Sequence, residues 1–251
     1  MSFAPVDYAG AAPKSNRTLI VVVIACGIGA VLVAVTTIGF VLPAIRNARA
    51  LDRSLVCKRN LRQIGRALHS YHIKHKSFPP AYAADENGKP MHSWRVLILP
   101  FLGHQKLFDR YRMNEPWDSP HNRSLAAEMP DVFRCPSFSD DSPMTHYVTV
   151  RSAETMFPGA EPVRIRDITD GTSNTLCVVS HRARAVHWMS PEDVSPDEFV
   201  RSLRRNDGPG HSGGTHVLTA DGAVRFFYAD TTEKRLRELL TRAGGEGDCC
   251  Y

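Results

Sequence analysis

The stretch Thr18–Ile45 reads TLIVVVIACGIGAVLVAVTTIGFVLPAI, and it decides the architecture because it contains no charged residue. A helix of about 20 apolar residues crosses the hydrocarbon core of a bilayer, so we predict a transmembrane helix over residues 18–43. A secretory signal has an apolar core of about 7–15 residues followed by a small-residue cleavage site. Because this stretch is longer and Pro-Ala-Ile-Arg ends it, we expect an uncleaved anchor.

The helical pattern continues beyond the apolar stretch. In AIRNARALDRSLVCKRNLRQIGRALHSYH, apolar residues recur close to a 3.6-residue period; they are Leu51, Leu55, Leu61, Ile64, Leu68 and Tyr71. This pattern predicts an amphipathic continuation over 44–76 that ends before Pro79-Pro80, which cannot extend a helix. We expect its apolar stripe to pack on a domain at 77–243, with a flexible tail at 1–17 and a Gly/Cys tail at 244–251.

The chain after residue 133 has the character of strands and turns. THYVTVR (145–151) alternates, TLCVVS (175–180) is typical of a buried strand, and THVLTA and AVRFFY are joined by Asp221-Gly222, a strong hairpin signal. Helix starts are predicted at Ser119-Pro120, at Ser190-Pro191, at the Ser195/Glu198 capping box, and at Thr232. The pattern predicts an α+β fold in which the long N-terminal helix packs against an antiparallel sheet.

The charge is +5 overall, and it is uneven. Between Ala44 and Lys76 there are nine Lys and Arg residues against one acid, Asp52. We expect membrane lipid as their partner, because anionic headgroups attract such residues. Nucleic acid would bind to the same charges, but no aromatic residues that could stack on bases interleave with them, so we expect no nucleic-acid partner.

Only two basic residues, Lys14 and Arg17, precede the span. The positive-inside rule by itself therefore favours a cytoplasmic C-terminal domain.

The six cysteines are too few for a disulfide-dense scaffold at this length. Cys57 and Cys135 are candidates for a disulfide if the domain faces an oxidising compartment. Cys177 is expected in the core, and Cys26 within the span. No Cys/His spacing predicts a zinc site, so we expect neither a metal nor another cofactor.

Several polar and aromatic residues are candidates for a site. His211 and Asp221 suggest a ligand or metal site at the mouth of a hairpin. We favour the alternative, in which Asp221-Gly222 makes the turn and His211 forms hydrogen bonds with backbone groups of its own Gly-rich loop. His69 and His72 share a helix face, but two ligands are not a site. Asp170 begins a turn that could otherwise coordinate a cation. The tryptophans are expected in the core or at its rim rather than on a sugar platform; they are Trp94, Trp117 and Trp188.

A set of phrases resembles domain-of-unknown-function family 1559, the H-x9-D-G proteins, also grouped as solute-binding-like. The phrases run in the family's order over roughly 45–228: VLPAIRNARALDRSLVCKRNLRQIGRALHSYH, SFPPAY, HSWRVLILPFL, EPWDSPHN, FRCPS, ITDGTSNTL, HWMSPEDV, and His211 followed by nine residues and Asp221-Gly222. The resemblance implies a pilin-like architecture with an extracytoplasmic domain. Many relatives begin with a prepilin signal, Gly-Phe-Thr-Leu-Ile-Glu. Here Asn16-Arg17-Thr18-Leu19-Ile20-Val21 lacks the Gly, Phe and Glu, which argues against prepilin cleavage.

We therefore expect a non-enzymatic, single-pass protein of the inner membrane with a pilin-like extracytoplasmic domain and a structural or interaction role in the cell envelope. The partners expected are lipid and other envelope or pseudopilin-like proteins. On topology, we follow the resemblance over the charge count. One alternative is a membrane-tethered solute- or glycan-binding domain that uses the three tryptophans and His211. Another is a hydrolase that uses His211 and Asp221.

Overall fold

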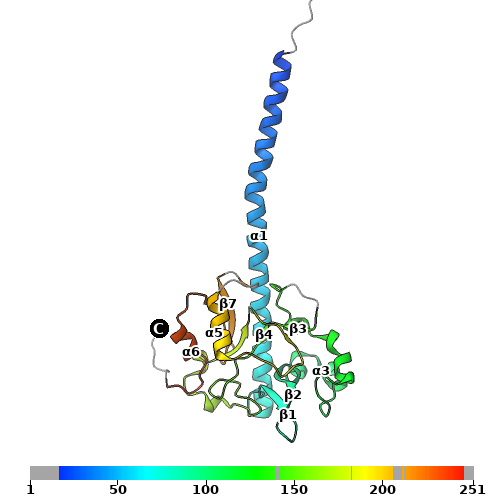
Figure 1. Ribbon diagram of the computed structural model, residues 1–251, viewed down its shortest axis with the longest axis vertical. Coiled ribbons are helices and arrows are strands. Elements are labelled where there is room, and N and C mark those ends of the chain that lie inside the picture. Colours follow the sequence, from blue (N-terminus) through cyan, green and yellow to red (C-terminus); the bar gives the residue numbers. More distant parts are fainter. Residues whose placement is uncertain (1–16, 139–141, 182, 206–210, 212, 246–251) are drawn as a thin grey trace, which may run out of the picture. The chain divides into compact units, whose positions relative to one another are not determined.

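The computed structural model describes residues 17–138, 142–181, 183–205, 211 and 213–245. Its α-helices are α1 (Arg17–His75), α2 (Trp94–Leu97), α3 (Gln105–Arg110), α4 (Pro120–Ser124), α5 (Pro196–Arg205) and α6 (Glu233–Glu238). Its strands are β1 (Tyr82–Ala84), β2 (Pro90–Ser93), β3 (Met144–Thr145), β4 (Tyr147–Val148), β5 (Leu176–Ser180), β6 (Val186–His187), β7 (Gly214–Thr219) and β8 (Val224–Tyr228). Five short 3-10 helices complete it: η1 (Leu99–Leu102), η2 (Ala126–Glu128), η3 (Asp131–Phe133), η4 (Ile165–Asp167) and η5 (Thr172–Asn174). Figure 1 shows these elements.

The chain divides into two compact units, residues 1–49 and 50–251. The described part of the first unit is helical throughout, and α1 continues without interruption through Pro43. An 18-residue window of α1 has a mean hydropathy of 2.9, and none of the window is buried within the chain. By its length and composition, this helix qualifies as a candidate membrane anchor or signal sequence.

The second unit is built on a four-stranded antiparallel sheet in the order β4-β5-β7-β8. β7 and β8 form the predicted hairpin, in register from Gly214 opposite Tyr228 to Leu218 opposite Val224. Two smaller antiparallel pairs, β1-β2 and β3-β6, lie outside this sheet. The α+β class predicted from the sequence is therefore confirmed.

Both faces of the sheet are covered. Neighbouring side chains on a strand point to opposite faces, and the consecutive buried residues Val217 and Leu218 accordingly belong to two different cores. Leu218 packs in the core that contains the second part of α1. Val217 packs in the core formed with α5 and α6, whose members include Phe199 and Leu236. The order of layers in the second unit is thus helix, sheet, helices.

The stripe of α1 that enters the core is shorter than predicted. Leu61, Ile64 and Leu68 are fully buried, but Leu51 is 62% and Leu55 is 57% exposed. An α-helix advances about 100° per residue, which places Leu55 about 120–180° and Leu51 about 80–140° around the helix from Leu61, Ile64 and Leu68. The prediction that these two leucines pack on the domain is wrong, because the apolar spacing changes phase after Leu55.

Two local predictions for the strand region are also wrong. THYVTVR is not one strand: the Thr145 hydroxyl donates to the carbonyl of Phe133 and accepts from the amide of Tyr147, and the chain changes sheets there. Ser190-Pro191 does not start a helix. Instead, the segment turns Asp193 into the interior, where it meets Arg95.

Arg95 and Asp193 form an ion pair in which both side chains are 0% exposed. Asp193 Oδ1 accepts from Arg95 Nη2 at 2.6 Å and from the amide of Thr149 at 2.9 Å. The guanidinium also donates to the carbonyl of Tyr147 and to the hydroxyl of Ser93. Because α2 supplies Arg95 and β4 supplies the carbonyl of Tyr147, this pair joins the segment after β2 to one edge of the main sheet.

The predicted caps and turn are confirmed. Ser119, Ser195 and Thr232 each accept a backbone N–H at the start of α4, α5 and α6. At the β7–β8 turn, Asp221 Oδ1 accepts from the amide of Ala223 at 2.9 Å, and Gly222 has a φ of 84°. A positive φ suits glycine, which lacks a Cβ. Caps and turns of this kind depend on residues only a few positions apart, which is why they can be predicted from the sequence.

Gly65→Leu tests the contact between α1 and the sheet. A Cβ at Gly65 would lie 2.9 Å from Leu218 Cδ1, so a leucine would overpack the core and lower the free energy of unfolding by about 1–3 kcal/mol. The control is Arg66→Leu, which adds the same side chain at the neighbouring exposed position. Urea denaturation of the full chain in detergent is the measurement, and equal midpoints for the two variants would contradict the packing.

Asp193→Ala tests the buried ion pair. It leaves the Arg95 guanidinium buried without its carboxylate, which should lower the free energy of unfolding by about 3–5 kcal/mol. As a control, Arg110→Ala breaks a pair with Glu128 whose side chains are 55% and 44% exposed, and it should cost less than about 1 kcal/mol. Denaturation midpoints compare the two variants, and a loss for Asp193→Ala no larger than that of the control would refute the structural role.

Candidate functional site

Two thiols and an imidazole converge in the interior of the second unit. Cys57 comes from α1, Cys135 from the segment after η3, and His211 from just before β7. The two Sγ atoms and a ring nitrogen of His211 all lie within 4.8 Å of one another. The three residues are 0%, 3% and 6% exposed. We call them the Cys57–Cys135–His211 cluster.

Two serine hydroxyls lie next to the cluster, one beside His211 and one beside Cys135. His211 Nε2 lies 3.6 Å from Cys135 Sγ, and its Nδ1 lies 3.3 Å from the hydroxyl of Ser137. The hydroxyl of Ser180, at the end of β5, lies 3.9 Å from Cys135 Sγ. One ring nitrogen of His211 therefore faces the sulfur atoms while the other faces a hydroxyl.

The two thiols have pKa values displaced in opposite directions. Burial, followed by the hydrogen bond and charge of Cys135, raises the pKa of the Cys57 thiol far above its ordinary range. The hydrogen bond from Cys57, followed by that from His211, lowers the pKa of Cys135 to about 4 although burial opposes this. Of the two sulfur atoms, Cys135 is therefore the one on which these contacts favour the thiolate form.

A second imidazole borders the cluster and ties the helix to the sheet. The ring of His216, on β7, lies 4.6 Å from that of His211 in an edge-to-face arrangement. Its Nε2 lies 2.8 Å from the hydroxyl of Ser54 on α1. Burial, followed by the proximity of His211, lowers the pKa of His216 to about 4, so this ring is neutral at neutral pH.

The structure separates His211 from Asp221. The two residues flank β7, whose six residues Gly214–Thr219 span roughly 20 Å at about 3.3 Å per residue. Asp221 is exposed and its carboxylate is used in the turn that it forms with Gly222. The two ends of the H-x9-D-G motif therefore do different things: the aspartate and glycine shape a hairpin, and the histidine joins two cysteines.

The tryptophans do not converge with His211. Trp94 and Trp188 are fully buried, with Phe133 in contact with both rings, and Trp188 Nε1 donates to the carbonyl of Ala126. The ring of Trp117 packs against the ring of His187, with 4.9 Å between the two ring centroids. Trp94 and Trp188 act as core residues, so these rings do not form the open aromatic surface that a sugar site would need.

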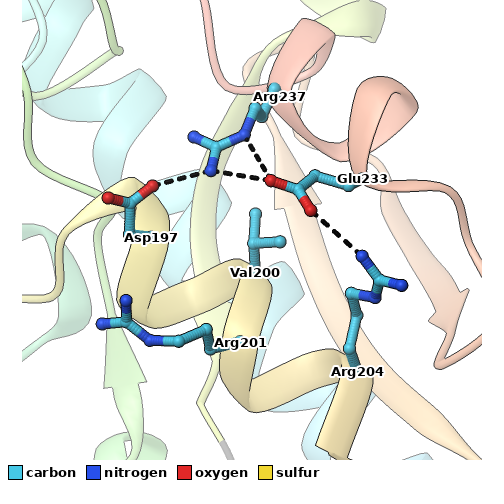
Figure 2. A pocket seen from close by; sticks show the side chains of 6 residues that line it. All are labelled: Asp197, Val200, Arg201, Arg204, Glu233 and Arg237. Atoms are coloured by element: carbon cyan, nitrogen blue, oxygen red, sulfur yellow. Dashed lines mark hydrogen bonds and ion pairs between the residues drawn. The ribbon is translucent and has the colours of Figure 1, made fainter.

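A hollow between α5 and α6 is lined by charged residues, as Figure 2 shows. Arg237 contacts Asp197 at 2.7 Å and Glu233 at 2.8 Å, and Arg204 contacts Glu233 at 3.0 Å. Because these carboxylates face the guanidinium groups, the hollow is a surface ion network. Exposed pairs of this kind each stabilise a protein by about 0–1 kcal/mol.

Sequence reasoning proposed the pair Cys57 and Cys135 but missed their association with His211. Cys135 follows Cys57 by 78 residues, and His211 follows Cys135 by 76 residues. Zinc motifs recognised from sequence place ligands a few residues apart, so no spacing rule finds this cluster. The His and the Cys residues could each be singled out, but only the fold shows that they meet.

Oxidation of the reduced chain tests the proximity of the two thiols. In a variant with Cys249→Ser and Cys250→Ser, a mild oxidant in the presence of a chelator should form a Cys57–Cys135 disulfide, because the two Sγ atoms lie within 4.8 Å of one another. Peptide mass spectrometry identifies the bridge. Cys177, which is buried in β5, is the internal control and should stay a thiol; bridges to Cys177 in comparable amount would contradict the geometry.

Both cysteines are free thiols in the structure, so the disulfide expected from the sequence stays a prediction. Searches of curated proteins and of solved structures found no match. One protein-family model matches, and its description is SBP_bac_10, Protein of unknown function (DUF1559). It matches residues 46–155, which confirms, for that segment, the family resemblance predicted from the sequence.

Proposed function

We propose that this protein is a single-pass protein of the inner membrane whose α+β domain lies outside the cytoplasm and has a pilin-like, structural or interaction role in the cell envelope. The observation that carries the proposal is α1: an apolar segment of mean hydropathy 2.9 continues as one helix into the domain core. A helix that is anchor at one end and core element at the other fixes a folded domain to a membrane.

The pilin-like part of the proposal is supported by the packing of the helix on an antiparallel sheet. Leu61, Ile64 and Leu68 of α1 share a core with Val178 and Leu218 of the sheet. This fold departs from a bare helix-on-sheet arrangement, because α5 and α6 cover the second face. A fold of this kind presents its surface to partners while its sheet stays protected on both sides.

The interaction role is supported by apolar side chains that the domain leaves exposed. Leu51 and Leu55 lie one turn apart on α1, and both are more than half exposed. Exposed apolar residues close together are typical of contact surfaces. They lie eight and twelve residues beyond the predicted span, where lipid headgroups or another envelope protein would cover them. The role that we propose requires no catalysis.

Labelling of introduced cysteines in spheroplasts tests the topology. In a background with Cys249→Ser and Cys250→Ser, the variant Asn87→Cys places a thiol on the exposed β1–β2 turn, and Ser2→Cys places one before the span. An impermeant maleimide should label Asn87→Cys in intact spheroplasts, and Ser2→Cys only after lysis.

The two reporters control for each other, because a chain that crosses the membrane once places only one of them outside the spheroplast. Labelling of Ser2→Cys alone would place the domain in the cytoplasm, as the charge count favours, and would refute the proposal. Labelling of both reporters only after lysis would also refute it, since the chain would then not cross the membrane. A variant without either reporter gives the background from the internal cysteines.

A further inference from the structure

We propose that Cys57, Cys135 and His211 form a binding site for Zn²⁺, with the fourth coordination position left to water. The site is separate from the membrane anchor and from the role in the envelope that we propose above. The ion would join three segments that lie far apart in the sequence: the core part of α1, the segment after η3 and the start of β7.

The donor set is that of zinc. Thiolate and imidazole are ligands that Zn²⁺ prefers, and sites with two Cys, one His and an open fourth position are an established class. Tetrahedral zinc with Zn–S of about 2.3 Å and Zn–N of about 2.05 Å separates sulfur from nitrogen by about 3.6 Å. Cys135 Sγ and His211 Nε2 lie 3.6 Å apart, so the ion needs little rearrangement there.

The histidine is oriented as a ligand. A zinc-bound imidazole donates its other ring N–H to an oxygen, which fixes the ring and its tautomer. In this structure the Nδ1 of His211 lies 3.3 Å from the hydroxyl of Ser137. With the proton on Nδ1, the lone pair of Nε2 points toward the sulfur atoms. A disulfide between Cys57 and Cys135 would not require an imidazole beside the sulfur atoms. The position of the His211 ring therefore favours a bound metal ion over a disulfide.

The electrostatics and the polar surroundings also suit a cation. All three side chains are buried, and two buried thiolates are costly unless a positive charge neutralises them; Zn²⁺ supplies two charges. The hydroxyl of Tyr147 is buried beside the two cysteines, since it interacts with both Cys57 and Cys135. It can bond to the water in the fourth position.

The test is metal binding by the full chain in detergent, reduced and in a background with Cys249→Ser and Cys250→Ser so that the terminal pair does not contribute. Zn²⁺ is titrated against a chromophoric chelator, and Co²⁺ is added separately to report thiolate coordination by its charge-transfer absorption. We expect about one Zn²⁺ per chain, a Co²⁺ spectrum of a tetrahedral thiolate site, and protection of both thiols from oxidation when zinc is bound.

Variants assign the binding to the cluster. Cys57→Ser and His211→Asn should lose the site, and Ser137→Ala should weaken zinc affinity by about 10–100-fold, as removal of a partner of a ligand does. Cys177→Ser removes another buried cysteine and should bind as the parent does. His211→Cys restores a zinc ligand at the same position and should recover binding, which separates loss of a ligand from loss of the fold.

Two results would overturn the proposal. The first is a reduced, folded parent chain that binds no zinc, or that binds it equally well after Cys57→Ser. The second is a Cys57–Cys135 disulfide in protein taken from its own membranes with thiols alkylated at lysis, because a disulfide uses both thiolates. Folding of each variant is checked by circular dichroism before titration.

Discussion

The close approach of α1 to β7 is the constraint on which the second unit depends. Gly65 has no side chain, and Leu218 fills the space that a Cβ would take. This contact sets how near the helix lies to the sheet, and the buried residues of both elements pack around it in one core. A larger residue at Gly65 would displace the side chain of Leu218 and disturb the packing of the helix on the sheet at this point.

The polar groups of the interior lie along the same junction or near it. Ser54 of α1 contacts His216 of β7, and Cys57 meets Cys135 and His211 one turn further along the helix. Arg95 and Asp193 connect α2 to the edge of the main sheet, where Arg95 donates to the carbonyl of Tyr147. Buried polar groups stabilise a fold only when they are matched, so these contacts specify one arrangement of helix and sheet where apolar packing alone would accept several.

Features with a local signal could be predicted. The apolar stretch, the end of α1 before Pro79, the caps at Ser119 and Ser195, and the Asp221-Gly222 turn each depend on neighbouring residues. Features that depend on which face of a helix is buried, or on residues distant in the sequence, could not be predicted. Leu51 and Leu55 matched the helical period but lie off the buried face, and the predicted helix start at Ser190 gave way to a turn that delivers Asp193 to Arg95.

The sequence by itself determined the candidate anchor, the α+β class and the family resemblance, because hydropathy, periodicity and ordered motifs are properties of residues along the chain. The tertiary structure alone decided that His211 joins Cys57 and Cys135 in the interior, away from the Asp221-Gly222 turn at the other end of β7. The reason is physical: Cys57, Cys135 and His211 are separated from one another by more than seventy residues of chain, and only the fold of the second unit brings them together.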